Sequence, residues 1–225
     1  MKNSIIVAVD EINNKNFYKI LDCLDPNKCM IKIGSVAFNA MGHEIVSHVA
    51  RKGFNVFLDL KLHDIPNTIR KSIEGLISLP ISMITIHISG GLKMMKTAKE
   101  SVKNTDIKIF GVTALTSLSD DDTNIIFKRT ASEHVEAMLN LAEEAQIDGV
   151  VCSPHELNLV TARKSLKSIT PGIRLVESND DQNRVMTPKD AILNGADYIV
   201  VGRPITNAPN ISEALQEIHN SIKHL

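Results

Sequence analysis

Short apolar runs alternate with longer amphipathic stretches from one end of the sequence to the other. The runs are rich in β-branched and large aliphatic residues, which is typical of buried strands, and the stretches between them repeat apolar residues at helical spacing. Strands are predicted at 5–10, 30–34, 55–61, 83–87, 108–115, 149–153, 169–173 and 198–202. Helices are predicted at 37–52, 65–78, 92–103, 133–145, 154–166, 188–195 and 211–222. This alternation predicts repeated βα units around a parallel sheet.

Eight such units in an uninterrupted chain of 225 residues favour a closed (β/α)8 barrel, or TIM barrel, over an open doubly wound sheet. An open nucleotide-binding sheet usually has a glycine-rich turn after its first strand, whereas here residues 10–13 read Asp-Glu-Ile-Asn. No Gly/Ser-rich linker, charge block or low-complexity segment interrupts the pattern. We therefore expect a single domain over residues 1–225.

The composition points to a small-molecule partner. The 25 basic and 26 acidic residues nearly cancel, so nothing indicates electrostatic binding of nucleic acid. The three cysteines are odd in number and lack CxxC spacing, which argues against a disulfide framework or a structural zinc site and fits a reducing cytoplasm. No apolar run has the length of a membrane span, and the N-terminus lacks the pattern of a signal peptide. We expect a soluble cytoplasmic protein that binds neither nucleic acid nor membrane.

Charged residues gather at the carboxyl ends of the predicted strands, where barrel enzymes place their active sites. Asp59 and Lys61 lie two residues apart near the end of the strand at 55–61 and therefore share a face. Burying a lone ion there would cost roughly several kcal/mol, so these groups must pair with each other or with something bound. For the two residues alone, a purely structural ion pair is the alternative.

Two more charged residues extend this pair. Lys32 lies on the neighbouring strand at 30–34 and is expected beside Asp59, and Asp64 follows the end of the strand that carries Lys61. Together Lys32, Asp59, Lys61 and Asp64 would form a chain of alternating charge in which each group keeps its neighbour ionised. A lysine held cationic in this way is suited to act as a general acid rather than as a Schiff-base nucleophile.

A phosphate site is predicted at the last strand. It ends at Gly202 and Arg203, and barrels often bind phosphate in the loops after strands seven and eight. A glycine lets a backbone N–H approach an anion closely, and an arginine offers a bidentate fork. For an isolated Gly-Arg pair, an arginine bound to a surface carboxylate is the alternative. The long polar loop after Arg174 is interpreted as a lid, with Gln182 donating to a ligand phosphate once closed.

Other polar residues near strand ends are weaker candidates. His87 is interpreted equally well as a structural histidine, and Cys152 as a buried inert thiol rather than a nucleophile paired with His155. The eight histidines show no HxH or HExxH spacing, so no metal site is predicted.

The segment DLKLHDIPNT at 59–68 resembles the DxKxxDIPNT signature of the orotidine 5'-phosphate decarboxylase family. Shorter similarities follow the same order over nearly the whole chain. They lie at 8–10, 32–34, 87–91, 115–117, 149–153, 170–174, 181–185 and 201–203. Each short piece is weak by itself, but together and in order they are highly specific.

The resemblance implies that the chain is a carboxy-lyase that converts orotidine 5'-monophosphate to UMP and CO2, the final step of de novo UMP synthesis, with no metal or organic cofactor. It implies that Asp59 faces the substrate carboxylate and that Lys61 protonates C6. It further implies a homodimer with two shared active sites, in which Asp64 reaches the site of the partner subunit. The substrate-binding residues that it implies are Asp10 and Lys32 at the ribose hydroxyls, Thr68, Thr116 at the pyrimidine, and Arg174, Gln182, Gly202 and Arg203 toward the phosphate.

Two other functions stay open from the residues. A sister barrel acting on sugar phosphates, such as a hexulose-phosphate synthase or a pentose-phosphate epimerase, would use a metal at the same strand ends, where Lys32 and Lys61 would repel one. A non-catalytic nucleotide-binding barrel would leave the charged array without a purpose. The chain also differs from the family pattern at Ile88 and Ser89, where alanines are common, and at 176–178, which lacks a glycine often found early in the lid.

Overall fold

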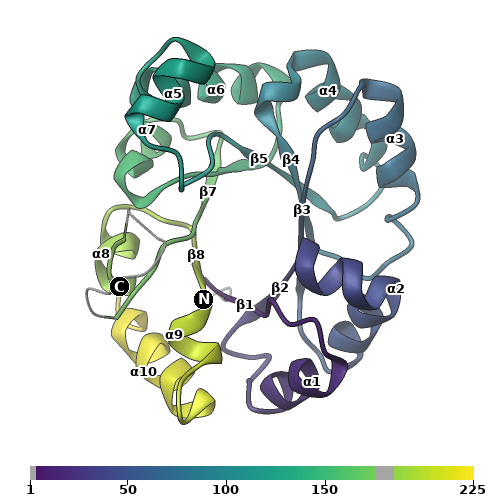
Figure 1. The fold of residues 1–225 in the computed structure, drawn as a ribbon, viewed down its shortest axis with the longest axis vertical. Helices are drawn as coiled ribbons and strands as arrows, with labels where there is room; N and C mark the ends of the chain where they lie inside the picture. Colours follow the sequence, from purple (N-terminus) through teal and green to yellow (C-terminus); the bar gives the residue numbers. More distant parts are fainter. Residues whose placement is uncertain (1–3, 176–184) are drawn as a thin grey trace.

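A closed ring of parallel strands surrounded by helices forms the molecule (Figure 1). The structure is a computed structural model and describes residues 4–175 and 185–225. Each strand pairs with the next in chain order, and β1 also pairs with β8, with Val7 opposite Val201. The predicted (β/α)8 barrel is therefore confirmed.

The strands are β1 (Ile5–Ala8), β2 (Met30–Gly34), β3 (Val56–Leu62), β4 (Met83–His87), β5 (Lys108–Val112), β6 (Gly149–Val151), β7 (Lys167–Thr170) and β8 (Tyr198–Val201). The helices are α1 (Asn14–Asp22), α2 (Ser35–Arg51), α3 (Pro66–Glu74), α4 (Leu92–Ser101), α5 (Asp120–Phe127), α6 (Ala131–Ala145), α7 (Leu157–Thr161), α8 (Pro188–Leu193), α9 (Arg203–Thr206) and α10 (Ile211–Ile222). Two short 3-10 helices, η1 (Ile88–Gly90) and η2 (Pro154–Glu156), follow β4 and β6.

The observed order of elements follows the prediction, but several bounds are different. Strand β7 begins two residues before the predicted 169–173 and stops at Thr170, because Pro171 has no backbone N–H to donate and Gly172 adopts φ 79°. Strand β5 ends at Val112 rather than at residue 115. Helices α1, α5 and α9 were not predicted.

Alternate residues of the strands fill the barrel interior. Met30, Phe57 and Met83 belong to an apolar cluster inside the ring, together with Phe110 and Tyr198. Because side chains on one face of a strand recur every two residues, the next inward positions on β2, β3 and β4 are Lys32, Asp59 and Thr85. An apolar barrel core is thus capped by a polar layer at the carboxyl ends of the strands.

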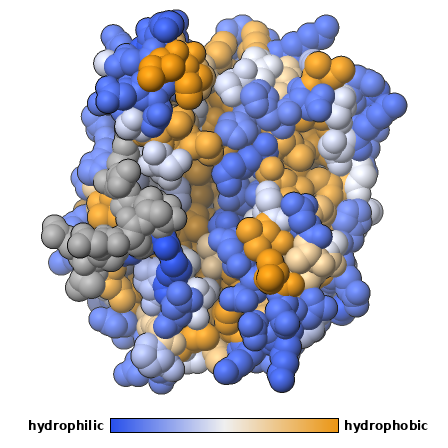
Figure 2. All heavy atoms as spheres, in the orientation of Figure 1, coloured by the Kyte–Doolittle hydropathy of each residue, from blue (hydrophilic) through white to orange (hydrophobic). Residues whose placement is uncertain are grey.

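The helices pack their apolar faces on the outside of the barrel, in a second and larger cluster that includes Phe17, Val46 and Leu139. Hydrophilic residues make up most of the rim of the face seen in Figure 2, with apolar atoms visible between them. No helix within residues 4–175 and 185–225 combines the length and the apolar character needed to cross a bilayer.

Candidate active site

A cavity of about 520 Å³ lies at the carboxyl ends of the strands. This volume is within the range of small-molecule sites, about 300–1,000 Å³. Its apolar lining includes Phe57, Val112, Ile169 and Val200. Of the residues proposed from the sequence, it brings together Asp10, Lys32, Asp59, Lys61, Thr116, Arg174, Gly202 and Arg203. Gln182 lies outside the described residues.

Four charged groups in this cavity form a continuous chain of ion pairs. Lys61 Nζ lies 2.9 Å and Lys32 Nζ lies 3.5 Å from Asp59 Oδ2. Lys32 Nζ also lies 3.2 Å from Oδ1 of Asp10. The two central side chains are nearly shut off from water, with 9% of Asp59 and 13% of Lys32 exposed. Asp10 and Lys61 are more exposed, at 49% and 36%, so they form the accessible ends of the chain of charges.

The Asp10–Lys32 end of this array depends on a glycine. A Cβ atom at Gly34 would lie 2.8 Å from Asp10 Oδ1 and 3.0 Å from Lys32 Nζ, closer than real Cβ atoms normally approach. Because both neighbours are charged groups in a fixed ion pair, a side chain at this position would push the pair apart. Glycine at residue 34 is thus explained by the site.

The strand that carries Asp59 and Lys61 is irregular at this point. The β3–β4 register runs from Leu58 opposite Ile84 to Leu62 opposite Ile86, so β3 contains two extra residues over this interval. Lys61 adopts φ 50°, a left-handed conformation that is uncommon for residues other than glycine. The simple alternation assumed for Asp59 and Lys61 is therefore interrupted here, although the two side chains still meet.

The buried Thr85 hydroxyl lies between the two residues on this bulge. It accepts a hydrogen bond from the backbone N–H of Lys61 at 2.8 Å and donates one to Asp59 Oδ1 at 2.9 Å. Thr85 was not predicted as a site residue, because threonine is a common strand residue and nothing around Met83–His87 indicates a polar role. The only available signal was its position, one strand beyond Asp59 on the inward face.

The Asp59 carboxyl group is held in its ionised form. Burial raises its pKa, but the charges of Lys32 and Lys61 and the hydrogen bonds from Lys61 and Thr85 outweigh burial and leave the pKa below its ordinary value. A permanent negative charge therefore stands between two ammonium groups inside the cavity.

Asp64 and Thr68 do not line the cavity of this chain. Asp64 is exposed, and its carboxylate accepts the backbone N–H of Ile65 at 2.7 Å. Among the described residues, the chain of alternating charges therefore ends at Lys61, and the expected extension to Asp64 is not made within one subunit.

Three weaker candidates lie outside the cavity. His87 is half-buried beside His63, with ring centroids 5.2 Å apart. Burial, and then the nearby His63 and Lys61, lower its pKa. Cys152 is completely buried, and burial raises the pKa of its thiol to about 12, which fits the predicted inert thiol and leaves His155 without a nucleophile to activate. Within the described parts of the chain, no three His, Cys, Asp or Glu residues group as metal ligands.

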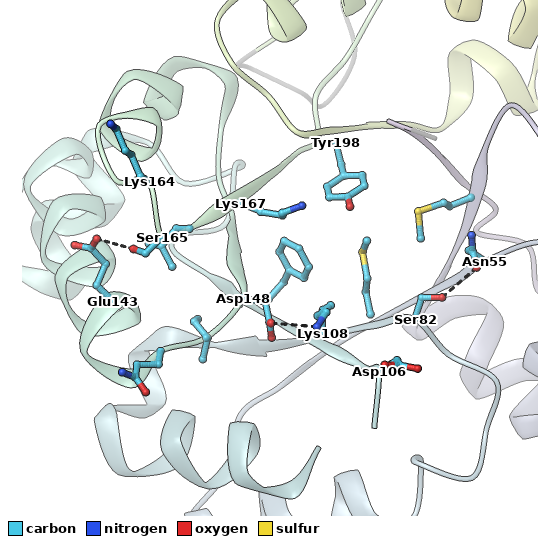
Figure 3. Close-up of a pocket in the computed structure, with 16 residues that line it drawn as sticks. Asn55, Ser82, Asp106, Lys108, Glu143, Asp148, Lys164, Ser165, Lys167 and Tyr198 are labelled. Carbon is cyan, nitrogen blue, oxygen red and sulfur yellow. Dashed lines mark hydrogen bonds and ion pairs between the residues drawn. The ribbon is translucent and has the colours of Figure 1, made fainter. Parts of the chain in front are cut away.

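A second cavity, of about 840 Å³, lies at the opposite, amino-terminal ends of the strands (Figure 3). Met30, Met83 and Tyr198, the first residues of their strands, form part of its lining. Some of its polar residues pair with each other, such as Ser165 with Glu143 at 2.8 Å and Ser82 with Asn55 at 3.4 Å. Conserved function in such barrels belongs to the carboxyl-terminal face, and the opposite face contributes to stability. The cavity with the charged array is therefore the candidate active site.

Comparisons of the sequence and of the structure with known proteins all lead to the same family. A family model described as "Orotidine 5'-phosphate decarboxylase / HUMPS family" matches residues 3–218. An orotidine 5'-phosphate decarboxylase of Saccharophagus degradans is 43% identical over 220 residues, which cover 95% of this chain and 92% of the relative. One of Mannheimia succiniciproducens is 43% identical over 233 residues, which cover 100% and 99%. The crystal structure of orotidine 5'-phosphate decarboxylase from Lactobacillus acidophilus superposes with a TM-score of 0.86 at 34% identity and covers 98% of this chain and 99% of its own.

Proposed function

The chain belongs to the orotidine 5'-phosphate decarboxylase / HUMPS family, and on this premise we propose that it decarboxylates orotidine 5'-monophosphate to UMP and CO2 without a cofactor. The observation that carries the proposal is the Asp10–Lys32–Asp59–Lys61 chain of ion pairs inside a nucleotide-sized cavity. We further propose that residues 1–225 act as one catalytic domain, because β8 pairs with β1 and closes the barrel.

The reaction requires a cation at the carbon that loses CO2. The bond from C6 to the carboxylate breaks, its electron pair stays on C6, and CO2 leaves. The ammonium of Lys61 stabilises this negative charge and then transfers a proton to C6, which forms the new C–H bond and leaves Lys61 neutral until it takes a proton from water. The role is supported by the Lys61–Asp59 ion pair, which holds the ammonium at a defined point of the cavity wall.

Asp59 is assigned to the other end of the same bond. Its ionised carboxylate, next to the substrate carboxylate, would repel that group in the ground state, and the repulsion is relieved as neutral CO2 leaves. Lys32 and Asp10, which continue the ion-pair chain toward β1, are assigned to the ribose hydroxyls. A hydroxyl can donate to the Asp10 carboxylate and accept from the Lys32 ammonium, so this pair suits a diol.

The phosphate is assigned to the ends of β7 and β8. Arg174, Gly202 and Arg203 line this side of the cavity, and α9 is a short extra helix directly after β8, as in other phosphate-binding barrels. Gln182 is proposed as a further phosphate ligand from the lid, and Thr116 is assigned to the pyrimidine. Binding energy from the phosphate contacts can then keep C6 of the substrate next to the charged residues Asp59 and Lys61 on β3.

The sugar-phosphate rival is less well supported. A metal-dependent enzyme needs several anionic or imidazole ligands around one point, whereas the Asp59 carboxylate is already paired with two ammonium groups. A divalent cation there would be repelled by Lys32 and Lys61.

Incubation with orotidine 5'-monophosphate tests the function directly. We expect loss of the substrate absorbance with formation of UMP, at a rate unchanged by prior treatment with a chelator. The control is the same protein with ribulose 5-phosphate and added Mg²⁺, for which no turnover is expected. Turnover of ribulose 5-phosphate would reject the proposal in favour of a metal-dependent sister enzyme, and a decarboxylation that disappears with the chelator would reject the cofactor-free mechanism.

We also propose a homodimer in which Asp64 and Thr68 complete the active site of the partner subunit. Their neighbours in the sequence, Ile65 and Asn67, line a surface cavity between α3 and α4, together with Ile77 and Leu92. Ile65 is 67% and Ile77 38% exposed, so this cavity presents apolar side chains to solvent. A two-fold contact through this surface would cover these apolar side chains and bring Asp64 to a second copy.

Mixed dimers test the shared site. Lys61→Ala and Asp64→Ala chains with different tags should each be inactive alone. After random assembly in one cell, about one quarter of wild-type activity is expected, since about half of the dimers are mixed and each has one intact site. A Lys61→Ala, Asp64→Ala double-variant chain mixed with the Lys61→Ala chain is the matched control and should stay inactive. Absence of recovery in purified mixed dimers would contradict a shared site.

A further inference from the structure

The hydroxyl of Thr85 connects the backbone of Lys61 with the carboxylate of Asp59. Thr85 lies in the middle of β4, is completely inaccessible to solvent and does not line the cavity. The donor and acceptor of each hydrogen bond are fixed by chemistry, because a backbone N–H can only donate and an ionised carboxylate can only accept. The hydroxyl therefore uses its single proton toward Asp59 Oδ1 and a lone pair toward Lys61 N.

This contact occurs where the backbone of β3 is strained. Lys61 is one of three residues other than glycine with positive φ in the described parts of the chain, and the others, Lys128 and Gln146, end helices. A left-handed conformation brings the Cβ atom of a non-glycine residue too close to its own backbone, so it needs support from the surrounding structure. The N–H of Lys61 lies in the stretch where the β3–β4 register shifts, and it points to the Thr85 side chain. The hydroxyl thus provides the partner that the irregular ladder would otherwise lack.

We propose that Thr85 is a positioning residue for decarboxylation, which fixes the left-handed backbone of Lys61 and the orientation of the Asp59 carboxylate as one unit. This inference rests on the proposed function for its kinetic consequence, but its geometric part stands on the contacts alone. Thr85 touches neither substrate nor cavity, so it acts through Lys61 and Asp59. Since Asp59 is held by Thr85 at Oδ1 and by the two lysines at Oδ2, rotation of the carboxylate would disturb both ion pairs.

Substitution of Thr85 by valine removes both hydrogen bonds at nearly constant volume. We expect Thr85→Val to lower kcat by about 10²-fold, the effect typical of a displacement of about 1 Å at a catalytic group. The affinity for UMP should change less than about threefold, because the phosphate contacts lie on other strands and Lys32 keeps its ion pair with Asp10. Thr85→Ser keeps the hydroxyl and should retain kcat within about fivefold of wild type.

Thr113→Val is the matched control. Thr113 is another buried threonine just after β5, and its hydroxyl donates to the carbonyl of Val151 at 3.1 Å instead of to the charged array. It should keep wild-type kcat within about threefold, although it too loses one buried hydrogen bond. Equal losses of kcat in Thr85→Val and Thr113→Val, or a proportional loss of UMP affinity in Thr85→Val, would overturn the proposal in favour of a general packing role.

A crystal structure of Thr85→Val separates this inference from the proposed function. If wild-type protein leaves orotidine 5'-monophosphate unchanged, the proposed function is rejected, but the backbone conformation of Lys61 in the variant can still be determined. We expect φ of Lys61 to leave the left-handed region and the Lys61–Asp59 pair to open. A variant that keeps φ near 50° and the 2.9 Å ion pair would refute the positioning role. If Thr85→Val does not fold, Thr85→Ala serves for both measurements, with Thr113→Ala as its control.

Discussion

Lys61→Ala is expected to lower kcat for orotidine 5'-monophosphate by at least about 10⁴-fold, because one substitution removes both the proposed general acid and the proposed cation at C6. The dissociation constant for UMP should change little, since Asp10, Arg174 and Arg203 remain and UMP has no carboxylate at C6. Steady-state turnover measured by absorbance and UMP binding measured by calorimetry together check this result.

Lys52→Ala is a suitable control for the loss of a lysine. Lys52 forms a shorter ion pair with Asp22, at 2.7 Å, but both side chains are about half exposed at the surface. This variant should have wild-type kcat. Retention of a tenth or more of wild-type turnover by Lys61→Ala would exclude Lys61 as the proton donor.

Asp59→Asn is expected to have the second largest effect, a fall in kcat of about 10³-fold together with a loss of stability. The substitution leaves the ammonium groups of Lys32 and Lys61 facing each other without the anion between them. Breaking a buried ion pair usually costs about 3–5 kcal/mol, and we expect about 2 kcal/mol here because Lys61 is a third exposed. Urea unfolding measures this change, and Asp22→Asn at the exposed Lys52 pair should cost less than about 1 kcal/mol.

The same carboxylate makes stability depend on pH. The pKa of Asp59 is lower in the folded than in the unfolded protein, so its contribution is complete above the unfolded value of about 3.9 and is lost as the pH falls through the lower folded value. As the pH falls from about 5 to the acid transition, the free energy of unfolding should therefore decrease more for the wild-type protein than for Asp59→Asn. Parallel acid dependence of the two proteins would show that Asp59 is not held ionised.

The order of strands and helices can be predicted from this sequence because the apolar runs of the strands and the helical spacing of apolar residues between them are both clear. Some strands were predicted two to three residues too long, because apolar residues continue from the strand into the loop. Strand β5 is an example, since it ends at Val112. Helix α5 was not predicted because its apolar residues do not mark a buried face. Its large apolar residues Ile125 and Ile126 are exposed, and only Thr123 is buried, so the segment lacks an inward apolar face.

The sequence predicts which charged residues form the site, but it does not predict the backbone conformation that positions them. Strand order and the place of these residues near the ends of β2 and β3 are enough to bring Lys32, Asp59 and Lys61 to one edge of the barrel. The left-handed conformation of Lys61 and its dependence on Thr85 have no local signal, because neither glycine nor asparagine occurs at the bulge. Such strain is set by the pairing of β3 with β4, which only the assembled sheet determines.

The pairing of β1 with β8 has a consequence for when activity can begin. Asp10 follows the first strand of the chain and Arg203 follows the last, yet both line one cavity. A ribosome-bound chain exposes Asp59 and Lys61 long before the segment that carries Arg203 has been synthesised. On the proposed function, the growing polypeptide is therefore unable to bind the substrate phosphate until the segment with Arg203 has emerged and the ring has closed.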